Sequence, residues 1–135
     1  MDAATLQATL DRIAADYVKR LQLRVETVAP GEVTLTMPVL PELVHGGGVL
    51  CGQAIMSAAD TAMLLAMIAQ LGEFRPMTTV QLQTSFLRPV PGNTADVIVT
   101  ARVLRFGKSL SYGEVQFELD GGRLAAHATT TYALL

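Results

Sequence analysis

The chain has 135 residues, of which 50% are hydrophobic and 16% are charged, and its formal net charge at pH 7 is −2. A chain of this length and composition can bury the core of one domain, residues 1–135, and the composition excludes a disordered protein. The small negative charge, without a run of lysines or arginines, argues against nucleic acid as a partner.

An amphipathic helix is predicted from Asp2 to about Arg20. Its hydrophobic residues recur at intervals of three and four positions and form one apolar stripe: Leu6, Leu10, Ile13 and Tyr17. Asp2 is placed to accept a hydrogen bond as the N-cap. The first residues lack the basic and then apolar pattern of a signal peptide, so we expect a cytoplasmic protein.

Two strands are predicted next, from Leu21 to Val28 and from Val33 to Val39. Both alternate between hydrophobic and polar residues, which is typical of strands with one buried face. Pro30-Gly31 between them is a turn signal, and Pro38 and Pro41 end the second strand. We therefore expect an antiparallel hairpin.

A long apolar helix is predicted from about Gly48 to Leu71, and Gly72 is placed to end it. Its hydrophobic residues occur all round the helix, which predicts burial on every side. The segment is long enough to cross a membrane. However, Asp60 lies near its middle, and a central carboxylate costs roughly 2.5–3.5 kcal/mol in lipid. We therefore favour a buried core helix and expect no membrane partner.

Four more strand patterns complete the chain: Val80 to Phe86, Ala95 to Phe106, Val115 to Leu119, and Leu124 to about Tyr132. In the first of them, Val80, Leu82 and Phe86 are predicted to share the hydrophobic face. Asp120-Gly121-Gly122 between the last two is a hairpin signal.

Together these elements predict an α+β fold in which a curved antiparallel sheet of about six strands wraps one long central helix, with a further helix at the N-terminus. Such a sheet has free edges and leaves one face of the domain to be covered. That is a physical reason to expect association with a second copy.

Asp60 is the first candidate for chemistry, because it is the only ionised side chain between Val44 and Leu71. Burial can tune a carboxylate for work as a nucleophile or general base. Alternatively, Asp60 accepts structural hydrogen bonds from Thr61 or from a neighbouring strand. The glycines at 46–48 and Gly52 form a second candidate. Backbone N–H groups leading into a helix bind oxyanions or phosphates, although glycines also serve loops that need positive φ.

Five segments of the chain carry a family resemblance: Val49–Ala54, Ala59–Ala62, Thr79–Leu82, Phe86–Pro89 and Arg105–Ser109. They resemble the hotdog-fold acyl-CoA thioesterases of the phenylacetate-degradation (PaaI-like) type, over about residues 20–135. The resemblance implies a hotdog fold and hydrolysis of an acyl-CoA thioester to free acid and CoA. It further implies that no metal or organic cofactor takes part, and that the protein is a homodimer or homotetramer.

The family signature is an Asn, a His-Gly-Gly that starts six residues later, and an Asp nine residues after the His. Aligned on Asp60, the signature falls on His45 for the Asn, Cys51 for the His, Gly52 for the first Gly and Gln53 for the second. The visible His-Gly-Gly that starts at His45 is out of register, because the position nine residues further on is Ala54. We prefer the register that retains Asp60, which makes the active-site signature divergent.

The resemblance implies a role for each matching residue. The backbone N–H of Gly52 polarises the thioester carbonyl, Asp60 attacks it or activates water, and Thr79 on the following strand assists. Along a helix, Gly52 and Asp60 would lie about 12 Å apart. One carbonyl cannot contact both in one subunit, so catalysis needs Gly52 from one chain and Asp60 from its partner.

The substituted positions allow two readings each. Cys51, near a helix start, is either a reactive thiolate or a small buried hydrophobic residue. With one cysteine and two histidines, the chain cannot form an internal disulfide or a standard zinc site. His45 either does polar work in place of the Asn or only closes a loop.

The candidate substrate-binding residues are Gln53, Arg88, Arg105 and Lys108. The three cations lie at strand ends and a turn, where they could meet the phosphates of coenzyme A, although solvated turn residues explain them nearly as well. The departures from the signature keep two alternatives open, a hotdog module that binds acyl-CoA without turnover and a purely structural oligomer.

Overall fold

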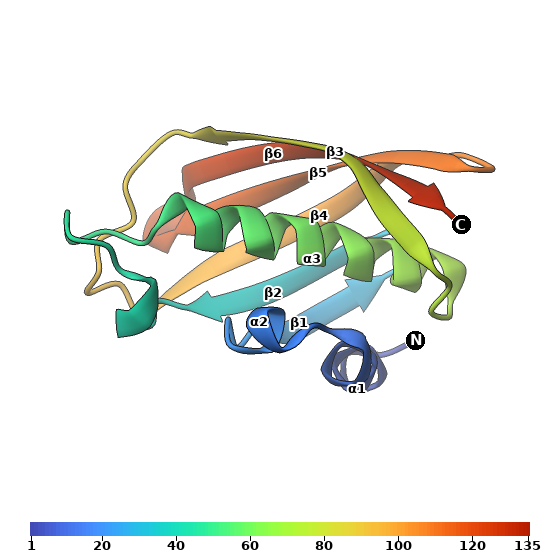
Figure 1. Cartoon of the computed structure of the whole chain (residues 1–135), viewed down its shortest axis with the longest axis horizontal. Coiled ribbons are helices and arrows are strands. Elements are labelled where there is room, and N and C mark those ends of the chain that lie inside the picture. Colours follow the sequence, from blue (N-terminus) through green and yellow to red (C-terminus); the bar gives the residue numbers. More distant parts are fainter.

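The computed structural model describes residues 1–135 as one six-stranded antiparallel sheet curved around a long helix (Figure 1). The strands are β1 (Arg24–Ala29), β2 (Glu32–Pro38), β3 (Met77–Phe86), β4 (Asp96–Phe106), β5 (Leu110–Leu119) and β6 (Arg123–Leu134). The helices are α1 (Ala3–Ile13), α2 (Asp16–Lys19) and α3 (Gly52–Leu71), with short 3-10 turns at Pro41–Leu43 and Asp120–Gly122. The strand order is β1-β2-β4-β5-β6-β3, so β1 and β3 are the two edges. The predicted α+β architecture is confirmed.

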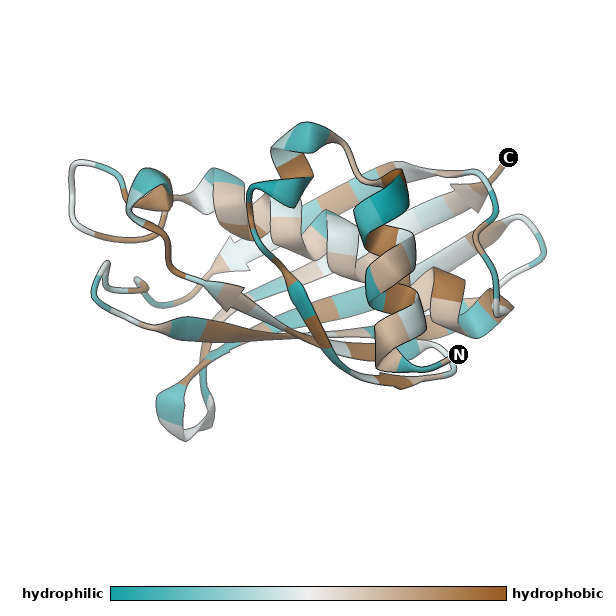
Figure 2. Ribbon diagram, turned by 90° about the horizontal axis from the view of Figure 1, so that it is seen from below, coloured by the Kyte–Doolittle hydropathy of each residue, from teal (hydrophilic) through white to brown (hydrophobic).

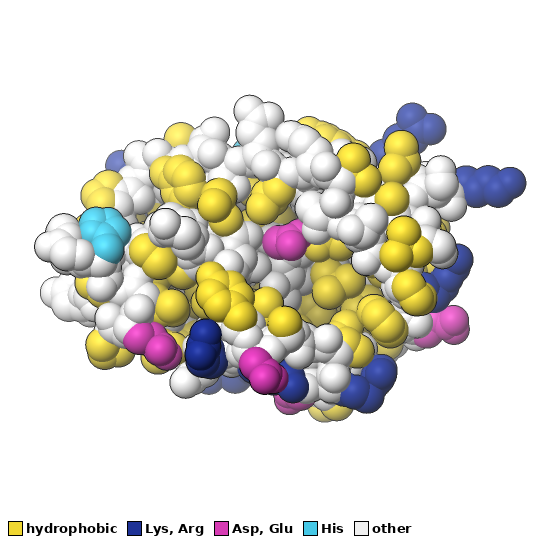
Figure 3. Space-filling model, viewed as in Figure 1, with side chains coloured by type: hydrophobic (Ala, Val, Ile, Leu, Met, Phe, Trp, Pro, Cys, Tyr) yellow, Lys and Arg dark blue, Asp and Glu magenta, His cyan; other side chains and the backbone are white.

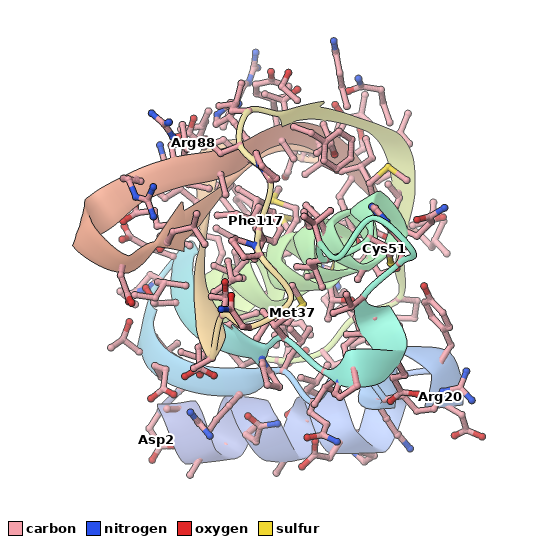
Figure 4. The ribbon with its side chains drawn as sticks, turned by 90° about the vertical axis from the view of Figure 1, so that its left-hand side faces the viewer. Asp2, Arg20, Met37, Cys51, Arg88 and Phe117 are labelled. Atoms are coloured by element: carbon pink, nitrogen blue, oxygen red, sulfur yellow. The ribbon has the colours of Figure 1, made fainter.

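The core lies between α3 and the concave face of the sheet. Phe117 of β5 and Met37 of β2 are fully buried there, pointing toward the helix (Figure 4). Hydrophobic residues run along α3 and along the strands behind it (Figure 2). The helix is long and apolar enough to cross a membrane, but 67% of the span is buried within the domain. This burial is what a core helix requires.

The N-terminal helix differs from the prediction because it is broken. Asp2 caps α1 as predicted, with the N–H of Thr5 donating to its carboxylate at 2.8 Å. However, Ala14 and Ala15 are extended, and a separate short helix, α2, follows. The first helix packs on both β1 and α3, and after the break α2 continues along α3. As a result Tyr17 leaves the apolar stripe and is 50% exposed.

Gln7 of α1 covers the free edge of the sheet beside β1. Its side-chain oxygen accepts from the N–H of Val25 at 2.7 Å, and its side-chain nitrogen donates to the carbonyl of Leu23 at 3.3 Å. Unpaired backbone groups at a sheet edge attract other strands. The edge at β1 is therefore partly covered at its start by Gln7, whereas no side chain covers the edge at β3 in this way.

Four predicted boundaries moved, and one of them is the start of β3, which lies at Met77 and not at Val80. The first strand begins at Arg24 and not at Leu21, because Gln22 has a φ of 55° and interrupts the extended path. The strand predicted from Val115 begins at Leu110, since it pairs with β6 as far as Ala133.

The central helix begins at Gly52, four residues after the predicted start, because Gly48 has a φ of 81° and Cys51 is extended. Gly72 ends α3 as predicted, with a left-handed φ of 81° and its N–H donating to the carbonyl of Ile68. Burial on every side was wrong. One stripe of the helix stays open in the single chain, formed by Gln53, Met56, Ser57, Asp60 and Leu64. Figure 3 shows this open face, with hydrophobic side chains around a hollow.

The edge strand β3 contains a β-bulge, and beyond it the alternation of inward and outward residues is reversed. Its register with β6 shifts between Thr79 and Gln81, so that Val80 is an extra residue and is 58% exposed. The prediction that Val80 shares the hydrophobic face with Leu82 was therefore wrong. Bulges of this kind re-aim side chains. Here the bulge lets both Thr79 and Thr84 lie half-buried toward the inside.

Candidate active site

Asp60 lies on the open stripe of α3 and is held by two hydroxyl groups. The hydroxyl of Thr79 donates to Oδ1 of Asp60 at 2.6 Å. The hydroxyl of Tyr132 lies 2.6 Å from the same Oδ1 and 2.7 Å from the backbone carbonyl oxygen of Asp60. None of the salt bridges in the chain includes Asp60, so its half-buried carboxylate has hydrogen-bond donors but no cation.

The sheet brings the two donors together. Thr79 and Tyr132 are direct partners in the antiparallel ladder between β3 and β6, immediately beside the bulge. Opposed residues of such a ladder point to the same face. Both hydroxyls therefore reach one point on α3 from adjacent strands, although Tyr132 is 72 residues from Asp60 in the sequence.

Tyr132 was not among the predicted site residues. It is 3% exposed, and this burial, followed by the negative charge of Asp60, raises the pKa of its phenol well above the ordinary value. The phenol therefore keeps its proton and acts as a donor. The available signal was that Tyr132 ends the inward face of its predicted strand, where a tyrosine hydroxyl requires a partner.

Gly52 is the first residue of α3, and its N–H has no acceptor within the helix. It borders a cavity of about 250 Å³ between the helix start and the segment Phe86–Val90. A side chain at this position would meet the Phe86 ring at 3.3 Å. A ligand oxygen in the cavity could accept a hydrogen bond there, where the helix dipole favours negative charge.

Both groups belong to the same helix, and eight residues separate them. At 1.5 Å per residue, the rise from Gly52 to Asp60 is about 12 Å. The two groups therefore do not converge on one atom within a single chain.

The comparisons with known proteins show the family of the chain. Residues 47–126, more than half of the chain, match the family model described as "Thioesterase superfamily". The chain belongs to this superfamily. A protein of Saccharolobus solfataricus named "Putative esterase SSO2140" is 30% identical over 122 residues, which is 90% of this chain and 85% of that protein. Membership supports a hydrolase that acts on thioesters.

Solved structures confirm the hotdog fold of this thioesterase-superfamily chain. The E. coli PaaI protein from the phenylacetic acid degradation operon has a TM-score of 0.84 and 21% identity, over 98% of this chain and 93% of that chain. Zebrafish thioesterase superfamily member 2 has a TM-score of 0.84 and 24% identity, over 98% and 95% of the two chains.

In this thioesterase-superfamily chain, His45 faces its own loop. It is exposed, and its Nδ1 accepts a hydrogen bond from the N–H of Gly47 at 2.8 Å. The backbone N–H of His45 donates to the carbonyl of Val49, which closes the glycine turn. None of these bonds reaches Asp60.

Cys51 and Gln53 flank Gly52 at the helix start. Cys51 occupies the N-cap position and is half-buried, and its side chain makes no capping hydrogen bond (Figure 4). Gln53 is exposed on the open stripe. Across the chain, no three His, Cys, Asp or Glu side chains form a cluster that could hold a metal ion.

The three candidate cations fall into two groups. Arg105 and Lys108 line one cavity of about 320 Å³ at the turn between β4 and β5. Arg88 lines the cavity beside Gly52, at the opposite end of α3. A single chain therefore does not bring all three cations to one ligand.

Proposed function

We propose that this protein hydrolyses an acyl-CoA thioester to the free acid and CoA, in the manner of the PaaI-like thioesterases. Asp60 is the nucleophile or general base, and the Gly52 N–H binds the oxyanion. The observation that carries the proposal is the environment of Asp60: a half-buried carboxylate on an open helix face, without a cation, held on one oxygen by two hydroxyl donors. Oδ2 has no partner within the chain and is free to meet a substrate or water.

Asp60 can act by two chemical routes, as a general base or as a nucleophile, and both account for every bond and proton. As a base, Asp60 takes a proton from water while the hydroxide adds to the carbonyl carbon, and the oxyanion rests on the Gly52 N–H. The C–S bond then breaks, and the CoA thiolate recovers the proton from Asp60. As a nucleophile, Asp60 adds to the carbonyl and expels CoA, and water then cleaves the resulting anhydride. In both routes Thr79 orients the reacting carboxylate.

The open edge of β3 supports a two-fold dimer as the active form. If two copies of β3 pair antiparallel about their middle, Thr79 of the partner subunit lies opposite Thr84, two residues from Phe86. Because of the bulge, both threonines face inward, as opposed residues of a ladder must. The Phe86 ring lies beside Gly52. The partner subunit's Asp60, bonded to its own Thr79, would thus approach Gly52.

The same pairing accounts for the separated cations. The turn that carries Arg105 and Lys108 lies beside the β6 end that pairs with Met77. In a centred pairing the partner subunit's Met77 is opposite Phe86, close to Arg88. We infer that Arg88 of one chain and the two cations of the other receive the CoA phosphates, with Gln53 at the substrate entrance.

A binding module without turnover is the second candidate. It is favoured by one observation: His45, which stands at the signature Asn position, uses its Nδ1 within its own loop, where it accepts from the N–H of Gly47. Such a module would retain the cations and the cavity beside Gly52 but would not release CoA.

The test is the release of free CoA thiol from short-chain, medium-chain, long-chain and aryl acyl-CoAs. Asp60→Asn is assayed beside the wild type, because it keeps the shape of the side chain and removes its basicity. We expect turnover with at least one class and a loss of at least about 10³-fold in Asp60→Asn. Saturable CoA binding with no turnover by the wild type would support the binding module instead.

A further inference from the structure

Tyr132 makes the longest-range contact of the proposed site. Its hydroxyl lies within 2.7 Å of two acceptors that belong to the same residue, Oδ1 and the backbone carbonyl oxygen of Asp60. Tyr132 belongs to β6, is 3% exposed and is part of the hydrophobic core. Tyr132 therefore connects the sheet to both the side chain and the backbone of Asp60, in the middle of α3.

The hydrogen bonds at Asp60 are asymmetric. Thr79 and Tyr132 both act on Oδ1, and no side chain or backbone group bonds Oδ2. Two short bonds to one oxygen prevent the carboxylate from rotating about its last bond, since rotation would break both. The two oxygens are thus not equivalent.

We propose that Tyr132 is a positioning residue of the thioesterase site, which anchors Oδ1 so that Oδ2 of Asp60 is the reacting oxygen. This inference rests on the proposed function. Oδ2 takes the proton from water or forms the new bond to the carbonyl carbon, while Tyr132 keeps its own proton throughout. Fixing a reacting atom in this way lowers the entropy lost on reaching the transition state.

Few other polar groups surround the carboxylate. Thr79 comes from β3 and Tyr132 from β6. On α3, one turn before Asp60, Ser57 bonds to the hydroxyl of Tyr17 from α2 at 3.0 Å. No lysine, arginine or histidine forms an ion pair with Asp60. Thr79 and Tyr132 are therefore the groups within the chain that hold the carboxylate in place.

The variant Tyr132→Phe tests this inference, because it keeps the buried ring and removes only the hydroxyl. We expect kcat to fall about 10- to 100-fold, the size expected for one hydrogen bond to a charged group. KM should stay within about twofold, since substrate contacts are unchanged.

Tyr17→Phe is the matched control. It removes a phenol hydrogen bond of similar length to α3 that does not involve the carboxylate, so its kcat and KM should match the wild type. All assays are run well below the lowest unfolding temperature of the variants. A lower unfolding temperature with a normal kcat in Tyr132→Phe would overturn the inference.

Asp60→Asn, assayed in parallel, separates the two proposals. If Asp60→Asn is inactive and Tyr132→Phe behaves as the wild type, the thioesterase proposal stands and the role of Tyr132 is refuted. If the wild type has no turnover, or Asp60→Asn retains it, both proposals fail.

Discussion

Gly52 occupies the one position of α3 where a proline can remove an N–H group without disturbing the helix. Proline fits the first position of a helix, and the residue before it must be extended. Cys51 meets that requirement, with φ −70° and ψ 148°. A change at Gly52 can thus separate the chemistry of the backbone N–H from the geometry of the helix start.

We expect Gly52→Pro to fold and to lose about 10²- to 10³-fold in kcat, the usual effect of deleting one oxyanion donor. Gly52→Ala keeps the N–H, and its Cβ meets only the Phe86 ring at 3.3 Å. It should retain most of the turnover in the CoA-release assay. Equal losses in the two variants would show that space beside Phe86 matters and the N–H does not.

At the scale of the elements, α3 lies close to the sheet because β5 carries a glycine beneath it. A Cβ at Gly113 would lie 2.5 Å from Sδ of Met63 and 2.6 Å from the carbonyl oxygen of Arg102. The second contact is with the backbone of β4, which cannot move without breaking the ladder. Gly113 thus allows α3 to pack closely against the sheet at Met63, one turn after Asp60.

Gly113→Ala should lower the free energy of unfolding by about 1–3 kcal/mol, the usual cost of overpacking a core. Urea denaturation followed by circular dichroism measures this change. Gly46→Ala is the control, since a Cβ there meets nothing within 4 Å and its φ is not positive. A Gly113→Ala protein as stable as this control would mean that α3 can move away from the sheet at no cost.

At the scale of the whole molecule, the edge of β3 and the open stripe of α3 lie on the same face. The edge at β1 is partly covered at its start by Gln7, whereas no side chain covers that at β3 in this way. A two-fold dimer through β3 would pair the free backbone N–H and C=O groups of this edge strand. It would also cover the open stripe of α3 around Asp60.

This arrangement predicts complementation between two inactive variants. In a heterodimer of Asp60→Asn with Gly52→Pro, one site keeps an intact Gly52 from the first chain and an intact Asp60 from the second. Coexpressed chains should recover activity toward about a quarter of the wild-type value, because half of randomly paired dimers carry one intact site of two.

The control pairs Gly52→Pro with the double variant Gly52→Pro/Asp60→Asn, which leaves no intact site. Sedimentation analysis verifies that the dimers form. Purified heterodimers without recovered turnover would contradict a site shared between subunits.

The sequence by itself determined the elements, because their signals are local. Alternation marked all six strands, Asp2 capped the first helix, Gly72 ended the central one, and Asp60 was recognisable as a lone carboxylate in an apolar helix. Periodicity and capping depend on neighbours within a few residues, so a chain without coordinates reveals them. The roles assigned to Gly52, His45, Cys51 and the cations stay predictions.

Only the tertiary structure decided what surrounds Asp60. The break after α1 accompanies the packing of α1 and α2 on distant elements of the domain, and the bulge after Thr79 depends on the register with β6. The contact between Tyr132 and Asp60 joins residues 72 positions apart. Such features arise from packing and strand pairing between distant segments. The energies of these contacts outweigh local propensities, and a short stretch of sequence does not show which distant segments will meet.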